Sequence, residues 1–365
     1  MSGLSFIVRD KTDTFVQKCI GGDASADLLW SVPSIASFTI DDDDRAVAAL
    51  IAPGARCSVM LGPDELFRGR VARTPGHGPK GQIEVHVEDD RRKFNDWLGW
   101  PKTTAPITGQ DVEYDVYTGP SETIFKAALA ANVARLGVPW TVVATQGRGS
   151  SARVELRFHK LADKLIPLLV ADRLGVVLAY PENGGVVVDV RSPRVVDGLL
   201  DAPTGIVDEF DFDRWASSAT RAVVGGREQG TERILAYVID TAREAEWADI
   251  IEVFRDARNT EPGADLTLEG WQTIADGAPG ASVSMDLIET DRFRFREHYD
   301  VGDIVPFNIG GAPGTEVITR VTISDTVRGG LTITPHIGDV NTDPLAQLGA
   351  RVAELKARVR DLGRS

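Results

Sequence analysis

Four consecutive aspartates, Asp41–Asp44, are the first residues of the sequence whose type and spacing suggest chemistry. Adjacent carboxylates can bind a metal ion, transfer protons, or bind the free N–H groups at the start of a helix. A calcium loop of the EF-hand type requires alternating ligands and a glycine at its sixth position, where this sequence has Ala46. Because Val47, Leu50 and Ile51 then follow at helical spacing, we predict that the aspartates cap a short helix.

A cysteine beside a histidine is the second candidate for chemistry. Cys57 with His77 or His86 would supply a nucleophile and a base. However, Cys57 lies at the start of a predicted hairpin strand, where a buried structural cysteine is the commoner case. No HExxH, P-loop, Gly-x-Ser-x-Gly or CxxC motif is present, and the histidines include no i, i+4 pair. We therefore expect no catalytic residue and no metal site, which favours a structural protein.

The composition is that of a folded globular protein, with 42% hydrophobic and 26% charged residues in 365. The net charge of −14 argues against a protein that wraps nucleic acid, although a like-charged wall would let DNA slide past it. No apolar stretch approaches the roughly 20 residues of a membrane-spanning helix, and the N-terminus shows no apolar core of signal-peptide length. We therefore expect neither export nor stable membrane association.

Residues 1–99 are dominated by strand patterns. Residues 57–71 are typical of a β-hairpin in which Pro63 and Asp64 suit the two middle positions of a type I turn. Residues 82–88 alternate polar and apolar side chains, which is the pattern of a half-buried strand. These patterns predict a first β domain.

Residues 100–203 form a predicted α+β unit between connectors that contain proline. A helix is expected over residues 120–136, with Pro120 at its first position and a glycine directly after it. A second helix is expected over residues 160–175, although Pro167 inside it weakens the pattern. A hairpin follows the second helix.

Residues 204–339 again favour strands. Residues 246–258 fit either a helix or a strand by pattern alone, whereas residues 268–277 indicate a helix. A long strand is expected over residues 281–291 and a hairpin over residues 303–324.

This last hairpin resembles the one near the N-terminus, which suggests an internal repeat. After two extra residues in the second loop, the matching pairs are Gly54 with Gly302, Leu61 with Ile309, Gly62 with Gly310, and Arg70-Val71 with Arg320-Val321. Any two hairpins bounded by glycine look alike, so duplication and chance both stay open at this point.

Residues 340–365 carry a heptad pattern of apolar residues that predicts a coiled-coil-like helix. Asp343 and Pro344 suit its N-cap and first position. The pattern covers fewer than three heptads, and Arg351 and Lys356 would repel each other between parallel chains, so the helix cannot hold an oligomer alone. We expect it to reinforce an association made elsewhere or to pack on its own domain. The seam residues are Leu345, Leu348, Val352, Leu355, Val359 and Leu362.

From about Phe38 to about Asp339 the sequence resembles the minor tail proteins that form the baseplate hub at the tail tip of long-tailed, non-contractile bacteriophages, especially those of actinobacteria. None of the matching stretches is a catalytic motif, so the resemblance lies in their order and spacing. They are "APGARCSVMLGPDELFRGRV", "EDDRRKFNDWLGWP", "TGPSETIFKAALAANVAR", "GRGSSARVELRFHKLADKLIPLLVADRLGVVLAY", "RAVVGG" with "TERILAYVID", and "HYDVGDIVPFNIGG" with "TRVTISDT" and "ITPHIGD".

The resemblance implies a mainly β chain with an α+β insertion and no cofactor. It implies a homotrimer whose subunits each contain two related β-barrel, tube-like domains, and it favours a strand for "IIEVFRDAR". The expected division is a first barrel hub domain at 1–99, the inserted α+β domain at 100–203, a second barrel hub domain at 204–339, and the C-terminal helix at 340–365.

The function that the resemblance implies is a trimeric tail-tip hub that continues or closes the tail tube. Three subunits with two similar barrels each would present six similar surfaces to a sixfold tube. Expected partners are the distal tail protein ring, the C-terminus of the tape-measure protein, and other tail-tip or fibre proteins, with DNA only passing through an acidic lumen. The expected location is the virion, and the host cytoplasm during assembly. The alternatives are a tail-associated peptidoglycan hydrolase and a receptor-binding protein for host glycans.

Overall fold

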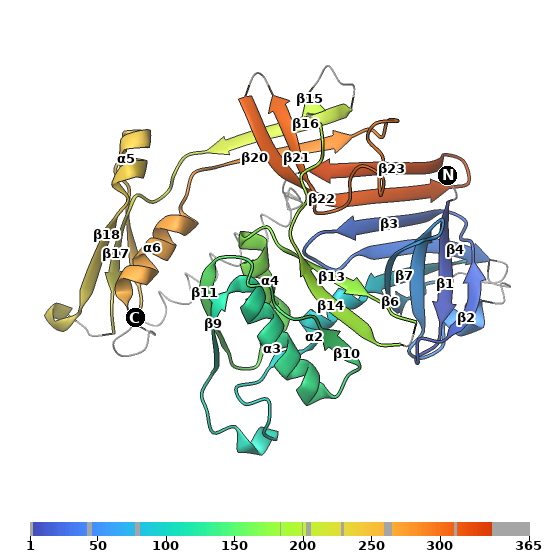
Figure 1. Ribbon diagram of the computed structural model, residues 1–365, viewed down its shortest axis with the longest axis horizontal. Coiled ribbons are helices and arrows are strands. Elements are labelled where there is room, and N and C mark those ends of the chain that lie inside the picture. Colours follow the sequence, from blue (N-terminus) through green and yellow to red (C-terminus); the bar gives the residue numbers. More distant parts are fainter. Residues whose placement is uncertain are drawn as a thin grey trace. The chain divides into compact units, whose positions relative to one another are not determined.

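The computed structural model describes residues 3–41, 46–76, 81–182, 184–198, 200–201, 206–227, 230–258, 265–309 and 312–337. The chain divides into two compact units, one made of Met1–Phe210 with Met285–Ser365 and the other of Asp211–Ser284. Strands predominate over helices (Figure 1), so the prediction of a mainly β protein is confirmed. Within the described part of the chain, no helix is long and apolar enough to cross a membrane.

The largest sheet draws its strands from both ends of the described chain (Figure 1). Its 13 strands are β1 (Leu4–Arg9), β2 (Phe15–Cys19), β3 (Ala24–Leu29), β4 (Ile35–Asp41), β5 (Arg56–Leu61), β6 (Asp64–Arg73), β7 (Gln82–Asp89), β15 (Leu200–Asp201), β16 (Val207–Trp215), β20 (Gly280–Leu287), β21 (Ile304–Ile309), β22 (Ala312–Thr326) and β23 (Gly330–Ile337). The spatial order is β16-β20-β23-β22-β3-β4-β7-β6-β5-β1-β2, with β21 beside β22 and β15 beside β21. Over the described residues this sheet does not close into a barrel.

The buried face of the sheet follows the alternation that the sequence predicts. Val85 and Val87 of β7 are buried, and the residues between and before them are partly exposed. Phe6 of β1 stacks on Phe38 of β4 with ring centroids 3.8 Å apart, and both side chains are almost fully buried. Each buried phenylalanine of this kind stabilises the fold by roughly 1.5–3 kcal/mol relative to an exposed one.

The β5–β6 hairpin is confirmed, but its turn lies one residue earlier than predicted. Leu61 pairs with Asp64, so the loop consists of Gly62 and Pro63. Gly62 has φ +60°, and proline fixes its own φ at about −65°, which together fit a type II′ turn. The type I prediction was wrong because the right-handed twist of paired strands favours a left-handed glycine at the first loop position.

The helix that the four aspartates were expected to cap is present as α1 (Val47–Leu50). Its N-cap residue is Ala46, which makes no side-chain capping hydrogen bond, so an aspartate is not the N-cap. Asp41 is the last residue of β4, and Asp42, Asp43 and Asp44 lie outside the described residues.

The predicted α+β insertion contains two helices and several short strands. Both helices are confirmed: Pro120 is the N-cap of the first, one residue before its predicted place, and Pro167 lies inside the second. Gly137 ends the first helix with φ +62°, a conformation that glycine adopts without strain. The elements are α2 (Lys93–Asp96), β8 (Leu98–Gly99), β9 (Asp115–Pro120), α3 (Ser121–Leu136), β10 (Trp140–Val142), β11 (Ser151–Leu156), β12 (His159–Lys160), α4 (Leu161–Ala171), β13 (Gly175–Ala179) and β14 (Val186–Arg191).

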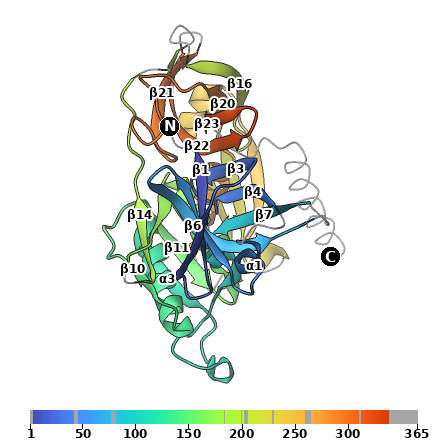
Figure 2. The same cartoon turned by 90° about the vertical axis from the view of Figure 1, so that its right-hand side faces the viewer.

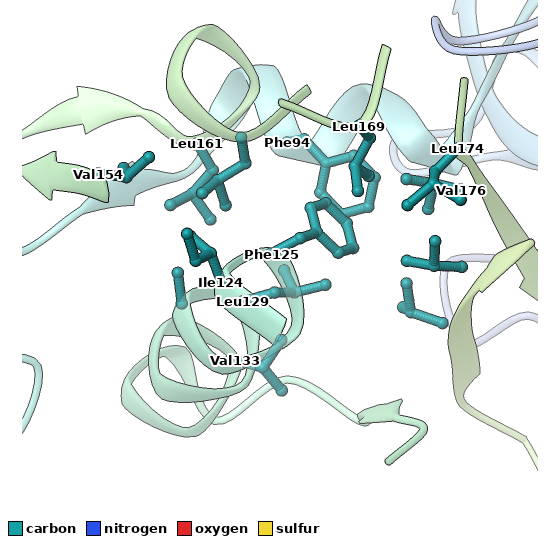
Figure 3. Close-up of a cluster of buried hydrophobic side chains, with 14 of the residues drawn as sticks. Phe94, Ile124, Phe125, Leu129, Val133, Val154, Leu161, Leu169, Leu174 and Val176 are labelled. Atoms are coloured by element: carbon teal, nitrogen blue, oxygen red, sulfur yellow. The ribbon is translucent and has the colours of Figure 1, made fainter. Parts of the chain in front are cut away.

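One apolar core fills the space between α3, α4 and the strands of the insertion (Figure 3). Ile124 and Leu129 of α3 and Leu161 of α4 point into it, and all three are at most 1% exposed. Phe94 of α2 meets Phe125 of α3 edge to face, with ring centroids 5.7 Å apart. This core holds the insertion together independently of the large sheet.

The second unit is a small sheet covered on one face by a helix. Its elements are β17 (Arg221–Gly225), β18 (Leu235–Ile239), α5 (Thr241–Trp247), β19 (Glu252–Asp256) and α6 (Leu266–Asp276). Ala222, Val238 and Ile274 form its buried core. The stretch 246–258, which fitted helix or strand, contains the end of α5 and the whole of β19, which pairs parallel to β17. The strand expected for its second half is therefore confirmed.

The C-terminal helix and its seam lie outside the described residues. Leu345, Leu348, Val352, Leu355, Val359 and Leu362 therefore stay a prediction, as does the division of the chain at residues 99, 203 and 339.

Candidate functional site

Two groups of four strands in the large sheet have the same order. We call β4, β5, β6 and β7 the first module, and β20, β21, β22 and β23 the second module. In each, the first strand in the chain lies beside the last, so the spatial orders are β4-β7-β6-β5 and β20-β23-β22-β21. All neighbouring strands within both modules run antiparallel. The repeat suggested by two hairpins therefore extends to four strands.

The two hairpins also begin and end alike. Gly54 and Gly302 precede their strands by two residues and have φ +81° and +88°. The residue after each glycine accepts a backbone hydrogen bond from the second hairpin strand: Val71 N–H to the oxygen of Ala55 at 2.9 Å, and Ile318 N–H to that of Asp303 at 2.8 Å. Each loop has two residues, because Leu61 pairs with Asp64 and Ile309 pairs with Ala312.

An irregularity at the same place in both modules makes the match more specific. The β6–β7 register shifts between Val71 and Arg73, and the β22–β23 register shifts between Ile318 and Arg320. Beyond the shift, Arg73 pairs with His86 and Arg320 pairs with His336. A β-bulge bends its strand and increases the twist, so both modules are bent at equivalent points.

The similarity includes the strand before each module. Thr39 N–H donates to the oxygen of Asp23 at 3.0 Å, which joins β4 to the start of β3. Ile288 N–H donates to the oxygen of Ile206 at 2.7 Å, which joins β20 to the start of β16. Strand β16 is therefore the counterpart of β3.

The sequence alignment of the repeat needs one correction. The alignment paired Val71 with Val321. The backbone hydrogen bonds show instead that Val71 matches Ile318. The additional residue lies in the first module, where the β5–β6 register shifts between Val59 and Met60. Counting residues between glycines misses such a bulge, because a bulge lengthens a strand without changing its partners.

A buried tryptophan connects the modules to the insertion. Trp30 follows β3 and is 7% exposed. A Cβ atom at Gly302 would lie 1.9 Å from Cε3 of this indole, and one at Gly175 would lie 2.3 Å from its Cζ2. Only glycine fits at both places, so the second module and β13 of the insertion approach the indole at the closest possible distance.

Charged groups surround this indole and are paired with one another. The Arg191 guanidinium lies 4.9 Å from the Trp30 ring centroid, within cation–π distance, and donates to the oxygen of Val301 at 2.5 Å. Arg194 forms an ion pair with Asp303 at 2.7 Å, and the Asp303 carboxylate is fully buried. These contacts fix β14 and the segment after it to the start of the second module.

A cavity of about 340 Å³ lies beside Trp30, lined by residues from β3, β6, β13 and the segment 296–301. Its acids and bases contact each other: Arg91 pairs with Asp89 at 2.7 Å and Arg296 with Asp300 at 2.8 Å. The hydroxyl of Tyr180 donates to a backbone oxygen at 2.8 Å, and burial raises the pKa of this side chain well above its usual value. The arrangement stabilises a junction and does not resemble an acid–base pair poised for catalysis.

The structure does not place the candidate nucleophile Cys57 beside a candidate base within the described residues. Cys57 is fully buried, as predicted, and burial raises the pKa of its thiol, which disfavours the thiolate that a nucleophile requires. His86 lies 3.4 Å from Glu84 in its own strand, and His77 lies outside the described residues. Where the structure describes the chain, no group of three or more His, Cys, Asp or Glu side chains could hold a metal ion.

One buried carboxylate was not singled out from the sequence. Glu122, in the first turn of α3, is fully buried and lies 2.8 Å from Lys126 Nζ and 3.0 Å from Arg148 Nε. Burial alone would raise its pKa, but the hydrogen bonds from these cations lower the pKa of Glu122 to about 2. The pairs attach the start of α3 to the loop before β11, which is a structural role.

Solved structures with a similar fold include tail proteins, two of them from prophages. The 43 kDa tail protein of prophage MuSo2 from Shewanella oneidensis matches with a TM-score of 0.56 at 12% identity, covering 91% of this chain and 98% of that one. The prophage tail protein gp18 from Listeria monocytogenes matches with a TM-score of 0.56 at 13% identity, covering 96% and 98%. A tail protein from Neisseria meningitidis MC58 matches with a TM-score of 0.54 at 13% identity, covering 93% and 97%. At these identities the likeness shows the fold alone.

The sequence itself identifies the family. Residues 30–339, more than half of the chain, match the family model of the Siphovirus ReqiPepy6 Gp37-like protein, so the chain belongs to this family of siphovirus proteins. No curated protein matches the sequence significantly. The expected class of a phage tail or baseplate structural protein is thereby confirmed.

Sequence reasoning found the repeat but missed Trp30, Gly175 and Asp303. Gly302 was noticed only as the match of Gly54. The side chains around the indole come from three regions far apart in the chain, and no local pattern marks such a contact.

Proposed function

We propose that this protein is a homotrimeric tail-tip hub that continues or closes the tail tube of a long non-contractile phage. The observation that supports the proposal most directly is the presence of two equivalent four-strand modules in one chain. Three chains would present six similar modules, and a sixfold ring requires six similar contacts. The duplication would then adapt sixfold to threefold symmetry.

In this proposal the modules belong to the barrel-like domains at 1–99 and 204–339, and the α+β domain at 100–203 is inserted between them. The described strands of one chain form an open sheet, and in this proposal strands of neighbouring subunits complete the barrels. The helix at 340–365 reinforces the trimer through its seam.

The partners of such a hub are the distal tail protein ring above it, the end of the tape-measure protein within it, and further tail-tip or fibre proteins. The hub is part of the virion and is assembled in the host cytoplasm. The net charge of −14 suits a lumen through which DNA slides without binding, and we expect net acidic residues to line it.

The mass of the purified protein in solution tests the proposal. Size-exclusion chromatography with light scattering should give three times the chain mass of 39.4 kDa. If the free protein is monomeric, the number of copies per assembled tail tip decides, and one copy per tip would overturn the proposal.

A further inference from the structure

The chain already contains one joint between a first and a second module. Strand β3 pairs with β4 on one edge and with β22 on the other (Figure 2). The β22 ladder runs from Arg320 opposite Leu29 to Asp325 opposite Ala24. Trp30 N–H extends it with a hydrogen bond to the oxygen of Thr319 at 3.0 Å. The joint therefore consists of the strand before one module and the far half of the bulged strand of the other.

The described chain also contains the two halves of a second such joint, and neither half has a partner strand among the described residues. One half is the free edge of β16, and the other is the end of β6 with the residues that follow it. Among the described strands, β16, the counterpart of β3, pairs with β20 alone. On its β5 side, β6 pairs as far as Arg70, followed by a hydrogen bond from Val71 to Ala55. Residues 72–76 have no strand on that side among the described residues.

The backbone groups on both edges have the right direction for a ladder. Because the oxygen of Ile206 faces β20, the alternate residues Val207 and Glu209 direct their N–H and C=O groups to the free edge. On the other edge, the oxygen of Pro75 accepts from Glu84 N–H of β7 at 3.0 Å. Thr74 and Gly76 therefore face outwards, and Pro75 removes no donor from the free edge.

We propose that β16 of one copy adds antiparallel to residues 72–76 of a second copy and repeats between chains the β3–β22 joint. This deepens the proposed hub function and rests on it, since the joint is heterologous and closes into a ring only with a fixed number of copies. Transferring the β3–β22 register places Phe210 opposite Pro75 and Glu209 opposite Gly76. The occupant is a second copy because the chain carries both halves of the joint.

A cross-link tests the register. In the β3–β22 joint, Asp27 and Thr322 occupy the positions that correspond to Phe210 and Pro75. They form a pair without mutual backbone hydrogen bonds. The Cα atoms of such a pair are about 4.5 Å apart, which is within the range that a disulfide spans. The double variant Pro75→Cys/Phe210→Cys should give disulfide-linked dimers and trimers on non-reducing gels, with the linked peptides identified by mass spectrometry. The two native cysteines, Cys19 and Cys57, are buried and should contribute little background.

The matched control is Pro75→Cys/Asp208→Cys, in which the second cysteine lies two residues along the same strand. It should cross-link at least about fivefold less, because diagonal positions are about 7–8 Å apart. A disulfide within one chain, equal yields in the two variants, or no disulfide would each overturn the proposed joint.

A second variant tests the joint without cysteines. Glu209→Pro removes an outward N–H group, whereas Glu209→Ala changes the same side chain and keeps it. We expect the proline variant to weaken self-association about tenfold relative to the alanine variant, with unchanged thermal unfolding of the monomer. If trimers form equally well in both variants, the joint is wrong and the trimeric hub stands; if wild-type assembled tips contain one copy, the hub itself is wrong.

Discussion

The two modules share their strands but not their connections. Before the first module, a short segment that contains Trp30 joins β3 to β4. At the equivalent place before the second module, between β16 and β20, the chain forms β17, β18, α5, β19 and α6. The shared strands keep the same order, the two-residue hairpin loop and the bulge after Val71 and Ile318. They differ in one further bulge in the first module, in the second edge of β3 and β16, and most of all in what is inserted between the strands. A duplicated frame can thus repeat one contact while its two halves acquire separate attachments.

The largest expected difference between the modules concerns their matched glycines. Both have positive φ, but a Cβ atom at Gly302 would meet buried Trp30 at 1.9 Å, whereas one at Gly54 would meet exposed Lys11 at 2.9 Å. Gly302→Ala should lower the free energy of unfolding by about 3–5 kcal/mol, and Gly54→Ala by about 1–2 kcal/mol. Denaturant unfolding of both variants measures the difference. Equal losses would contradict a special role of the Trp30 junction in the second module.

A smaller expected effect concerns the insertion and the dependence of its stability on pH. The pKa of Glu122 is lowered to about 2, so the ion pairs of this side chain stabilise the protein above the ordinary glutamate pKa near 4.5. This contribution, about 3 kcal/mol, should disappear as the pH falls from 4.5 towards 2. Replacing the carboxylate in Glu122→Gln should lower stability at pH 7 and flatten its decrease over that range, as followed by thermal unfolding.

The comparison variant for this measurement is Glu113→Gln, which alters an exposed carboxylate paired with Arg157 at 3.1 Å. Its pH dependence should match that of the wild type. If Glu122→Gln also retains the wild-type pH dependence, other carboxylates cause the acid sensitivity.

The smallest expected effect concerns the C-terminal seam. Leu348→Asp/Leu355→Asp should weaken self-association by at most about tenfold, because fewer than three heptads cannot hold chains together alone. Light scattering over a dilution series measures the change. The control is Ala346→Asp/Ala353→Asp, which adds the same charges at the same spacing but outside the seam. An unchanged association in the leucine variant would show that these helices do not pair between chains.

Local features of the fold could be predicted from the sequence and long-range ones could not. Helix α3 carries its own signals in Pro120 and Gly137, and the β7 strand shows strict alternation, so both were predicted correctly. The β5–β6 and β21–β22 hairpins were found because their strands are adjacent in the chain. The predicted turn type was wrong because the loop lies one residue earlier than expected. Glycine and not proline therefore occupies the first loop position, and proline occupies the second.

The pairing of β3 with β22 joins residues nearly 300 positions apart, and periodicity contains no information about such a partner. The same limit applies to the site. The repeat was visible through Gly54 and Gly302, but the bulges that establish its register change no residue type. The family resemblance supplied the class of protein because it depends on the order of many segments, which one local motif cannot provide.

The 15 residues of β22 form one continuous strand that bends at its bulge and pairs with β21 before the bulge, with β3 after it and with β23 on the other edge. A force directed along β22 would load the hydrogen bonds of all six β3–β22 residue pairs at once, in shear geometry, instead of breaking them one after another. The molecule would therefore resist axial tension much better than peeling from the side.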